Sequence, residues 1–401
     1  MSAVYRRLMW KSGVIASLLS LVFVLGCTGN GETPSASTAG ASTATTVGAS
    51  GGFDSLAPTA TTAPGVSFDA LSGRAAHTAT MLLSGDVLVA GGCITDGCAV
   101  ATAETFIVAS DGASVVRGPD LTGPRDGHTA TALADGSVVL IAGYAGEGQP
   151  PLASVEVFDA VSRNIRTHAH LHQRRGGHAS ALLTGDRVLV VGGWIARRTY
   201  TSTAEVVDIS SGSVTEAAQL PVALHAMDAV TLADGRVLVT GGQIEGGEGT
   251  NGAWIYDAPS DSWSETGPMT ERRFKHVSVL LPDGRVLVIG GTTDDREILS
   301  TTEIYHPVSG SFTPGPDLVE PRYKLPGGAV VIDGDRVVVG GGGRTIEIID
   351  LASGTSIAVE DLGSQGSFAT TTALGDGRVL VLGGYDRSID LRRQVRLIPS
   401  T

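Results

Sequence analysis

Arginine and histidine recur together, three residues apart, at four places along the chain. Planar guanidinium groups bind carboxylates through paired hydrogen bonds, so arginines gathered at one surface would suit carboxylates or sugar acids. We therefore treat the four arginines as ligand-binding candidates. The alternative is that each arginine and histidine satisfies loop carbonyls and joins adjacent structural units. The pairs are Arg74/His77, Arg125/His128, Arg175/His178 and Arg273/His276.

Three further histidines alternate with other residues at His168, His170 and His172. In an extended chain, alternate side chains lie on one side, so three imidazoles could bind zinc or copper. Neither a carboxylate nor a cysteine lies among them, and we expect this segment to be a water-exposed connection. We therefore predict surface histidines, no metal site and no cofactor.

Two cysteines, Cys93 and Cys98, lie close together in one predicted loop. In an exported protein such a pair indicates a disulfide more often than a metal site. A copper-radical centre would need a tyrosine crosslinked to a cysteine, and no aromatic residue lies near either cysteine in sequence. We predict a Cys93–Cys98 disulfide that fixes one surface loop.

The N-terminus has the features of an export signal. Basic residues at 6, 7 and 11 precede the nearly apolar run 14–25, and Gly26 stands directly before Cys27. This resembles a bacterial lipoprotein signal, with residues 1–26 removed and Cys27 lipidated. An ordinary secretory signal or a single spanning helix are the alternatives. We expect an extracytoplasmic lipoprotein of the bacterial cell envelope, in the outer membrane or at the cell surface, held to the membrane by its lipid.

Residues 27–64 are dominated by Thr, Ser, Ala and Gly, with almost no large apolar side chain. Such a segment cannot bury enough surface to offset its conformational entropy, so we predict a disordered tether. The whole chain carries a formal net charge of −13. An acidic protein repels phosphate backbones, which argues against a nucleic-acid partner.

From residue 65 onward the sequence repeats about every fifty residues. Each repeat has a run of small and β-branched residues that ends in a paired glycine. A period of this length is typical of a four-stranded propeller blade. We predict an all-β fold of seven blades over residues 65–401. The second glycine of each unit falls at Gly92, Gly143, Gly193, Gly242, Gly291, Gly341 and Gly384.

The fifth unit shows the strand plan. Residues 275–281 and 285–289 form the first two strands around a Pro-Asp-Gly turn, and a loop of about eleven residues leads to a third strand at 303–305. A fourth strand ends near Phe312. The last unit supplies only three strands, and residues 66–71 match a fourth strand. We therefore expect an N-terminal strand to complete the last blade and close the ring.

The paired glycines, the Glu-x-aromatic-Asp third strands and the Trp263 position together resemble the kelch repeat family. Ala142 replaces one glycine, and only one unit keeps tryptophan in its fourth strand. The resemblance implies a β-propeller similar to the central domain of galactose oxidase, usually acting as a binding scaffold. A minority of relatives are enzymes, including a sialic acid mutarotase.

In such a blade, the long second-to-third loops and the blade connections share one face of the ring. Binding residues concentrate in variable loops, and Tyr144, Trp194 and Tyr385 lie in these loops. We expect a monomeric, non-enzymatic scaffold that presents this face to a protein or glycan. The alternative is a carbohydrate-active enzyme of the mutarotase type at the channel mouth, with the arginines near that mouth.

Overall fold

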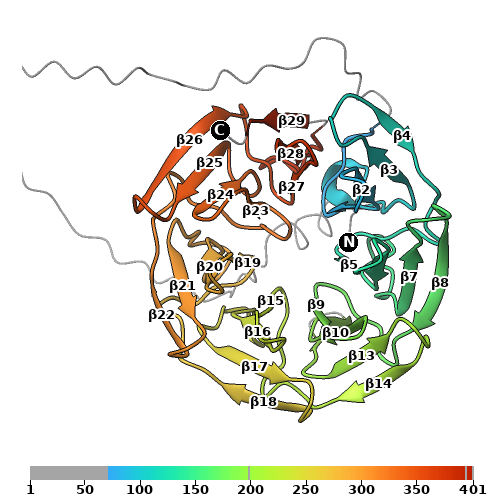
Figure 1. The fold of residues 1–401 in the computed structure, drawn as a ribbon, viewed down its shortest axis with the longest axis horizontal. Coiled ribbons are helices and arrows are strands. Elements are labelled where there is room, and N and C mark those ends of the chain that lie inside the picture. Colours follow the sequence, from blue (N-terminus) through green and yellow to red (C-terminus); the bar gives the residue numbers. More distant parts are fainter. Residues whose placement is uncertain (1–70, 197–198, 393–394, 400–401) are drawn as a thin grey trace, which may run out of the picture. The chain divides into compact units, whose positions relative to one another are not determined.

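Each unit of the repeat forms one antiparallel sheet whose strands follow one another in chain order. The computed structural model describes residues 71–196, 199–392 and 395–399. Within these residues there are seven such sheets, arranged around a common axis (Figure 1). The seven-bladed propeller predicted from the repeat is therefore confirmed. The predicted signal, Cys27 and the tether lie outside the described residues.

Six blades have four strands. The first four blades are β1 (Thr78–Met81), β2 (Val87–Ala90), β3 (Thr105–Val108), β4 (Val115–Arg117); β5 (Thr129–Ala132), β6 (Val138–Ile141), β7 (Ser154–Phe158), β8 (Ile165–His170); β9 (Ala179–Leu183), β10 (Arg187–Val191), β13 (Ala204–Asp208), β14 (Val214–Ala217); and β15 (Asp228–Thr231), β16 (Val237–Thr240), β17 (Ala253–Asp257), β18 (Ser262–Glu265). The next two are β19 (Val277–Leu280), β20 (Val286–Ile289), β21 (Thr302–His306), β22 (Ser311–Pro314); and β23 (Ala329–Val331), β24 (Arg336–Val339), β25 (Thr345–Asp350), β26 (Thr355–Asp361).

The seventh blade has three described strands, β27 (Thr370–Ala373), β28 (Val379–Leu382) and β29 (Val395–Ile398). The strand expected to complete it, residues 66–71, lies outside the described residues except for Leu71. That leucine is buried against residues of β2, β3 and β28. A two-stranded ribbon, β11 (Trp194–Ala196) with β12 (Thr199–Tyr200), forms the long loop of the third blade. No described helix is long or apolar enough to cross a membrane.

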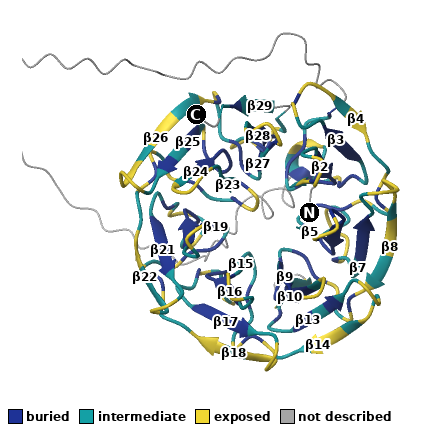
Figure 2. Ribbon diagram, in the orientation of Figure 1, coloured by how far each residue is buried: buried dark blue, intermediate teal, exposed yellow. Residues whose placement is uncertain are grey.

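Burial follows the position of each strand in its blade. The second strands are apolar on both sides and buried along their length, because neighbouring blades cover both faces. The outermost strands are largely exposed (Figure 2). The first strands of successive blades contact one another around the whole ring, including β1 with β27. The small residues predicted for the innermost strand therefore lie where the blades converge.

The paired glycines let one blade lie close to the connection that enters the next. Gly91 and Gly92 have φ values of 61° and 95°, which favour glycine. A Cβ atom on Gly91 would lie 2.5 Å from the carbonyl oxygen of Arg125, and one on Gly92 would lie 2.8 Å from that of Ala75. The repeat signature is therefore a packing requirement between blades.

Candidate binding site on the loop face

The recurring arginines are buried between blades. Arg125 and Arg175 enter the second and third blades, and each is at most 1% exposed. The Nη2 of Arg175 donates to Glu205 at 2.7 Å, and its Nη1 donates to the Gly192 carbonyl at 2.8 Å. Arg125 pairs with Glu156 in the same way, Arg273 pairs with Glu303, and Arg74 pairs with Glu104.

Three of these glutamates, Glu156, Glu205 and Glu303, also accept hydrogen bonds from backbone N–H groups. The two carboxylate oxygens of Glu205 accept hydrogen bonds from the backbone N–H groups of His172 and Gln173. The pair therefore fixes the connection between two blades to a third strand. Burial and these contacts leave Arg74, Arg125, Arg175 and Arg273 no surface for a ligand, so the ligand-binding role considered for them is wrong. Their contacts match the alternative, in which each arginine satisfies loop carbonyls and joins structural units.

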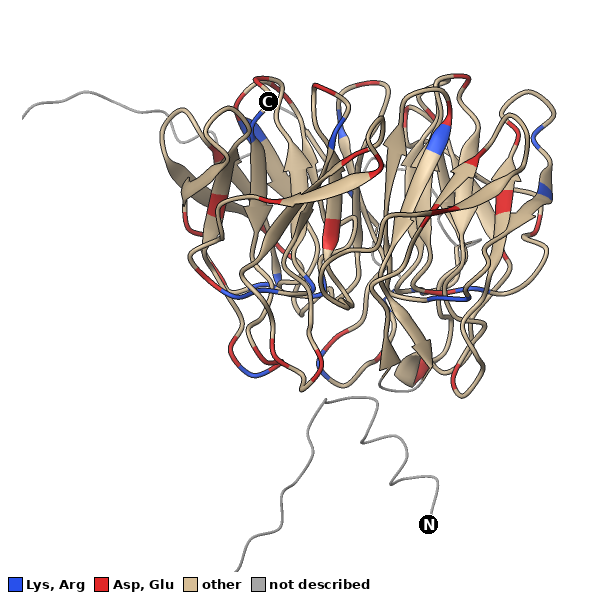
Figure 3. Cartoon of the chain, turned by 90° about the horizontal axis from the view of Figure 1, so that it is seen from below, with Lys and Arg blue, Asp and Glu red and all other residues tan. Residues whose placement is uncertain are grey.

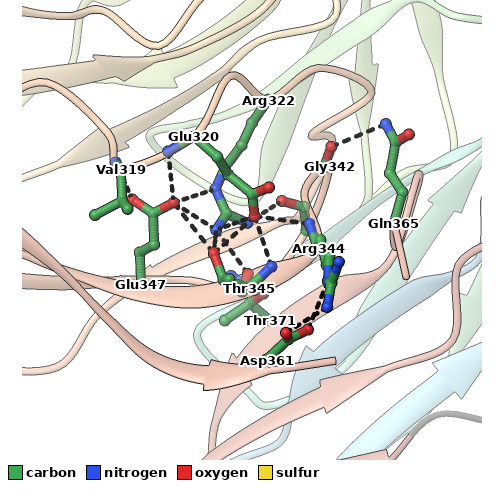
Figure 4. Close-up of polar contacts among 12 residues, drawn as sticks. Val319, Glu320, Arg322, Gly342, Arg344, Thr345, Glu347, Asp361, Gln365 and Thr371 are labelled. Carbon is green, nitrogen blue, oxygen red and sulfur yellow. Dashed lines mark hydrogen bonds and ion pairs between the residues drawn. The ribbon is translucent and has the colours of Figure 1, made fainter. Parts of the chain in front are cut away.

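A fifth arginine of this kind, Arg322, was missed by the sequence reasoning. Its side chain donates to Glu347 and Thr345, as Figure 4 shows. It also donates to the Gly341 carbonyl at 2.9 Å. The run of four glycines at 340–343 obscures how this unit aligns with the other six. The second glycine of its pair is Gly342 and not the predicted Gly341. The repeat period was the available signal, because Arg322 lies 49 residues after Arg273, much as Arg175 lies 50 residues after Arg125.

The repeated histidines join inner strands of adjacent blades. His178 Nε2 shares a hydrogen bond of 3.0 Å with Thr129 Oγ1, and His77 Nε2 shares one of 2.9 Å with Thr370 Oγ1. The second of these links the first blade to the last. Burial, reinforced by the charge of the nearby arginine, lowers the pKa of both histidines to about 3. They are therefore neutral parts of the blade packing.

Seven equivalent residues surround the axis where each connection turns into a first strand. All have φ between 53° and 59°, and backbone hydrogen bonds join most consecutive pairs, as from the Gly127 N–H to the Ala76 carbonyl. We call this set the axial ring. It lies at the end of the inner strands that faces the long loops, which we call the loop face. Its members are Ala76, Gly127, Gly177, Ala226, Lys275, Lys324 and Phe368.

Aromatic side chains gather on the loop face beside the small members of the axial ring. Trp194 stacks on Tyr200 with centroids 6.1 Å apart, meets the edge of Tyr144 at 6.5 Å and lies 5.0 Å from His225. All four residues are partly exposed. The Tyr200 hydroxyl donates to the side-chain oxygen of Gln243 at 2.9 Å. We call Tyr144, Trp194, Tyr200 and His225 the aromatic cluster.

The other side of the axial ring carries its bulky members. The Lys324 ammonium lies 4.8 Å from the ring centroid of Tyr323, 5.0 Å from that of Tyr385 and 6.0 Å from that of Phe368. On the preceding blade, Lys275 forms an ion pair with Asp295. The predicted candidates Tyr144, Trp194 and Tyr385 all lie at the loop-face end of the axis. Tyr144 and Trp194 are partly exposed, whereas Tyr385 is buried in an apolar cluster and does not offer a binding surface.

One carboxyl group next to the axial ring is buried. Asp126 is 3% exposed, and its Oδ2 atom has no hydrogen-bond partner among the described residues. Burial raises the pKa of Asp126 to about 7. A carboxyl that titrates near neutral pH can transfer protons, but it lies below the surface of the aromatic cluster.

The remaining candidates lie elsewhere. Cys93 and Cys98 form a disulfide in the long loop of the first blade. His168 and His170 are on the outermost strand β8, and the expected connection begins only after them. The described residues contain no group of three side chains placed to hold a metal ion. Acidic residues are spread over the turns and loops at both ends of the blades (Figure 3).

A cleft of about 360 Å³ also opens on the loop face between the fourth and fifth blades. Acidic side chains dominate its lining, which includes Glu248, Glu271 and Asp294. Arg272 crosses it and pairs with Glu248 at 2.6 Å. Because Arg272 is already paired with Glu248, the lining of the cleft does not indicate a particular class of ligand.

Comparisons with known proteins agree with this architecture. The Kelch motif matches residues 229–270 and 273–319, which span the fourth and fifth blades. A solved structure titled "Structure of YjhT" is similar with a TM-score of 0.56, covering 82% of this chain and 95% of that chain at 10% identity. At that identity the likeness concerns the fold. No curated protein matches the sequence.

Proposed function

Because the chain is a seven-bladed β-propeller that carries kelch motifs, we propose that it is a non-enzymatic scaffold that binds a glycan on its loop face. The aromatic cluster is the observation that carries this proposal. Its partly exposed residues come from consecutive blades and lie beside polar groups such as Gln243. Aromatic rings with hydrogen-bonding edges suit a ligand that has apolar faces and hydroxyl groups.

A glycan fits this face better than a protein does. The core of a protein interface is rich in large apolar side chains. Among the described residues, exposed large apolar side chains lie mainly in turns of the opposite face or on outer strands, as Leu83, Val161 and Val308 do. The loop face offers a small aromatic area within a polar, acidic surface.

The proposal includes the location of the scaffold. Lipidation at Cys27 would anchor the chain, and residues 27–64 would hold the propeller away from the lipid surface. A monomer at the outer membrane or cell surface of a bacterium would then expose its loop face to envelope or external glycans. The support for this location comes from the sequence of the first 64 residues.

Binding of the full chain to a panel of immobilised glycans tests the proposal. We expect Trp194→Ala to weaken binding at least about tenfold, because buried aromatic anchors dominate interfaces. The matched control is Val308→Ala, which alters an exposed side chain on the opposite face and should leave binding unchanged. Equal binding by the Trp194 variant, or binding only to proteins, would contradict the proposal.

Asp126 favours one alternative, a carbohydrate-active enzyme at the axis. Its raised pKa near 7 suits a general acid or base. Incubation of the protein with the glycans that it binds separates the two functions. A scaffold returns them unaltered, whereas an enzyme releases or interconverts products and loses that turnover in Asp126→Asn.

A further inference from the structure

Lysine is rare in this chain and its placement is specific. The sequence has three lysines, Lys11, Lys275 and Lys324, against 25 arginines. The two in the described part of the chain occupy equivalent positions of the axial ring on adjacent blades. Elsewhere arginine forms the ion pairs of turns and blades, as Arg285 does with Asp283. Arginine binds anions at least as well as lysine but does not release its proton, so the use of lysine here favours amine chemistry over anion binding.

The backbone makes this placement costly. Lys324 has a φ of 59°, a conformation that residues other than glycine rarely adopt, bulky ones least of all. Four of the seven equivalent positions carry glycine or alanine instead, which shows that a small residue satisfies the fold. Bulky residues held in such a conformation are more common at functional sites than elsewhere.

The surroundings of the two lysines differ. Lys275 stays charged and forms an ion pair with Asp295, whereas Lys324 has no ion pair with a described residue and lies among three aromatic rings. Burial, with a smaller contribution from the charge of Lys275, lowers the pKa of Lys324 to about 8, and the charge of Asp295 opposes the shift. Roughly one Lys324 side chain in ten is then a neutral amine at pH 7.

Besides Lys275 and Asp295, two phenols lie next to this amine. Burial raises the pKa of both Tyr323 and Tyr385, so their hydroxyl groups stay protonated at neutral pH. Tyr323 is also within the electrostatic influence of Asp295 and Arg387. Lys324 is therefore the group in this cluster that gains or loses a proton near pH 8.

We propose that the Lys324 amine is a nucleophile that binds aldehydes covalently as an imine. The Nζ lone pair attacks the carbonyl carbon, a C–N bond forms, and the carbonyl oxygen takes a proton to give a carbinolamine. That oxygen then leaves as water, and the nitrogen gives up its two hydrogens in the process. The step is reversible and involves no oxidation or reduction. Desolvated lysines beside a second cation react in this way.

The ligand class is a small aldehyde, which includes the open-chain form of a reducing sugar. The site lies on the loop face, across the axial ring from the aromatic cluster. Its reactivity is independent of glycan binding, and the Trp194→Ala variant should retain it in full.

Reductive trapping of the full chain tests the proposal. The protein is incubated with glycolaldehyde and cyanoborohydride at pH 7.5, and the modified lysines are located by peptide mass mapping. We expect Lys324 to be labelled at least about tenfold faster than Lys275, with this preference lost in urea. Lys324→Arg removes the fast site. Equal labelling of the two lysines, or no adduct at Lys324 in the folded protein, overturns the proposal.

Two neighbouring variants should change the rate in opposite directions. Lys275→Met removes a positive charge, so the pKa of Lys324 rises and labelling slows several-fold. Asp295→Asn removes the opposing negative charge, so that pKa falls and labelling accelerates. The pH at half-maximal rate should move up in the first variant and down in the second. Rates that change in the same direction in both, with the fold intact by circular dichroism, would also overturn the proposal.

Discussion

The buried side chain of Arg175 holds the connection that enters the third blade to the third strand of that blade. Replacing Arg175 with leucine leaves the Glu205 carboxylate buried, with two backbone N–H groups and the exposed His172 ring, 3.6 Å away, as its remaining partners. Loss of one member of a buried ion pair typically costs about 3–5 kcal/mol. We expect Arg175→Leu to lower the free energy of unfolding by about this amount, measured by urea denaturation followed by tryptophan fluorescence.

The fourth blade supplies the control, because it dispenses with the pair. Where the third blade has His172, Arg175 and Glu205, the fourth has Pro221, Leu224 and Trp254. Proline lacks the N–H that the glutamate would accept, and the leucine and tryptophan pack in one apolar cluster. Introducing all three residues into the third blade should therefore restore most of the loss. A triple variant no more stable than Arg175→Leu would contradict this account.

At the scale of the strands, the histidine–threonine contacts between inner strands make stability depend on pH. The pKa values of His77, His178 and His276 are lowered to about 3 by burial, below the unfolded value near 6.5. The unfolded chain therefore takes up protons first. Their contribution is complete above pH 6.5 and is lost progressively as the pH falls towards 3.

Two carboxyls act in the opposite direction. The pKa values of Asp126 and Asp228 are raised to about 7 and about 6, so protonation relieves a cost that they impose at higher pH. The histidines outnumber the two carboxyls. We therefore expect the urea concentration at the unfolding midpoint to decrease as the pH is lowered from 6.5 to 4.5. His178→Met, which copies Met227 of the fourth blade, should flatten this dependence. An unchanged slope in that variant would exclude the histidine as its source.

The elements themselves were predictable because their signals are local. The glycine pairs, the turns between strands and the apolar second strands each lie within one repeat. These local signals were enough to predict seven blades and the order of the strands in each. The roles of Arg125 and Arg175 depend on glutamates about thirty residues downstream, which only folding brings into contact. The sequence placed three candidates in loops, namely Tyr144, Trp194 and Tyr385. No local pattern indicated that the first two meet His225 in the aromatic cluster, or that three aromatic rings surround Lys324.

At the scale of the whole molecule, closure of the ring depends on the contact between its first and last blades. His77 bonds to Thr370, the Thr372 hydroxyl donates to the Ala79 carbonyl at 3.3 Å, and β1 contacts β27. In the part of the chain that the structure describes, β29 pairs with β28 alone. Its outer edge is where the predicted strand at 66–71 would add.

Leu71 connects that predicted strand to the ring. It is 5% exposed and packs in the cluster that joins the first and last blades, as Leu121 and Leu318 do between later ones. A chain that starts at residue 65 should unfold at the same temperature as the full chain. A chain that starts at residue 73 loses both the leucine and the strand and should unfold at least several degrees lower, since burial of a leucine alone is worth about 2–5 kcal/mol. Leu71→Ala in the full chain separates the two contributions, because it removes the side chain and keeps the strand. Equal thermal midpoints for the chains that start at 65 and 73 would show that the ring closes without the N-terminal strand.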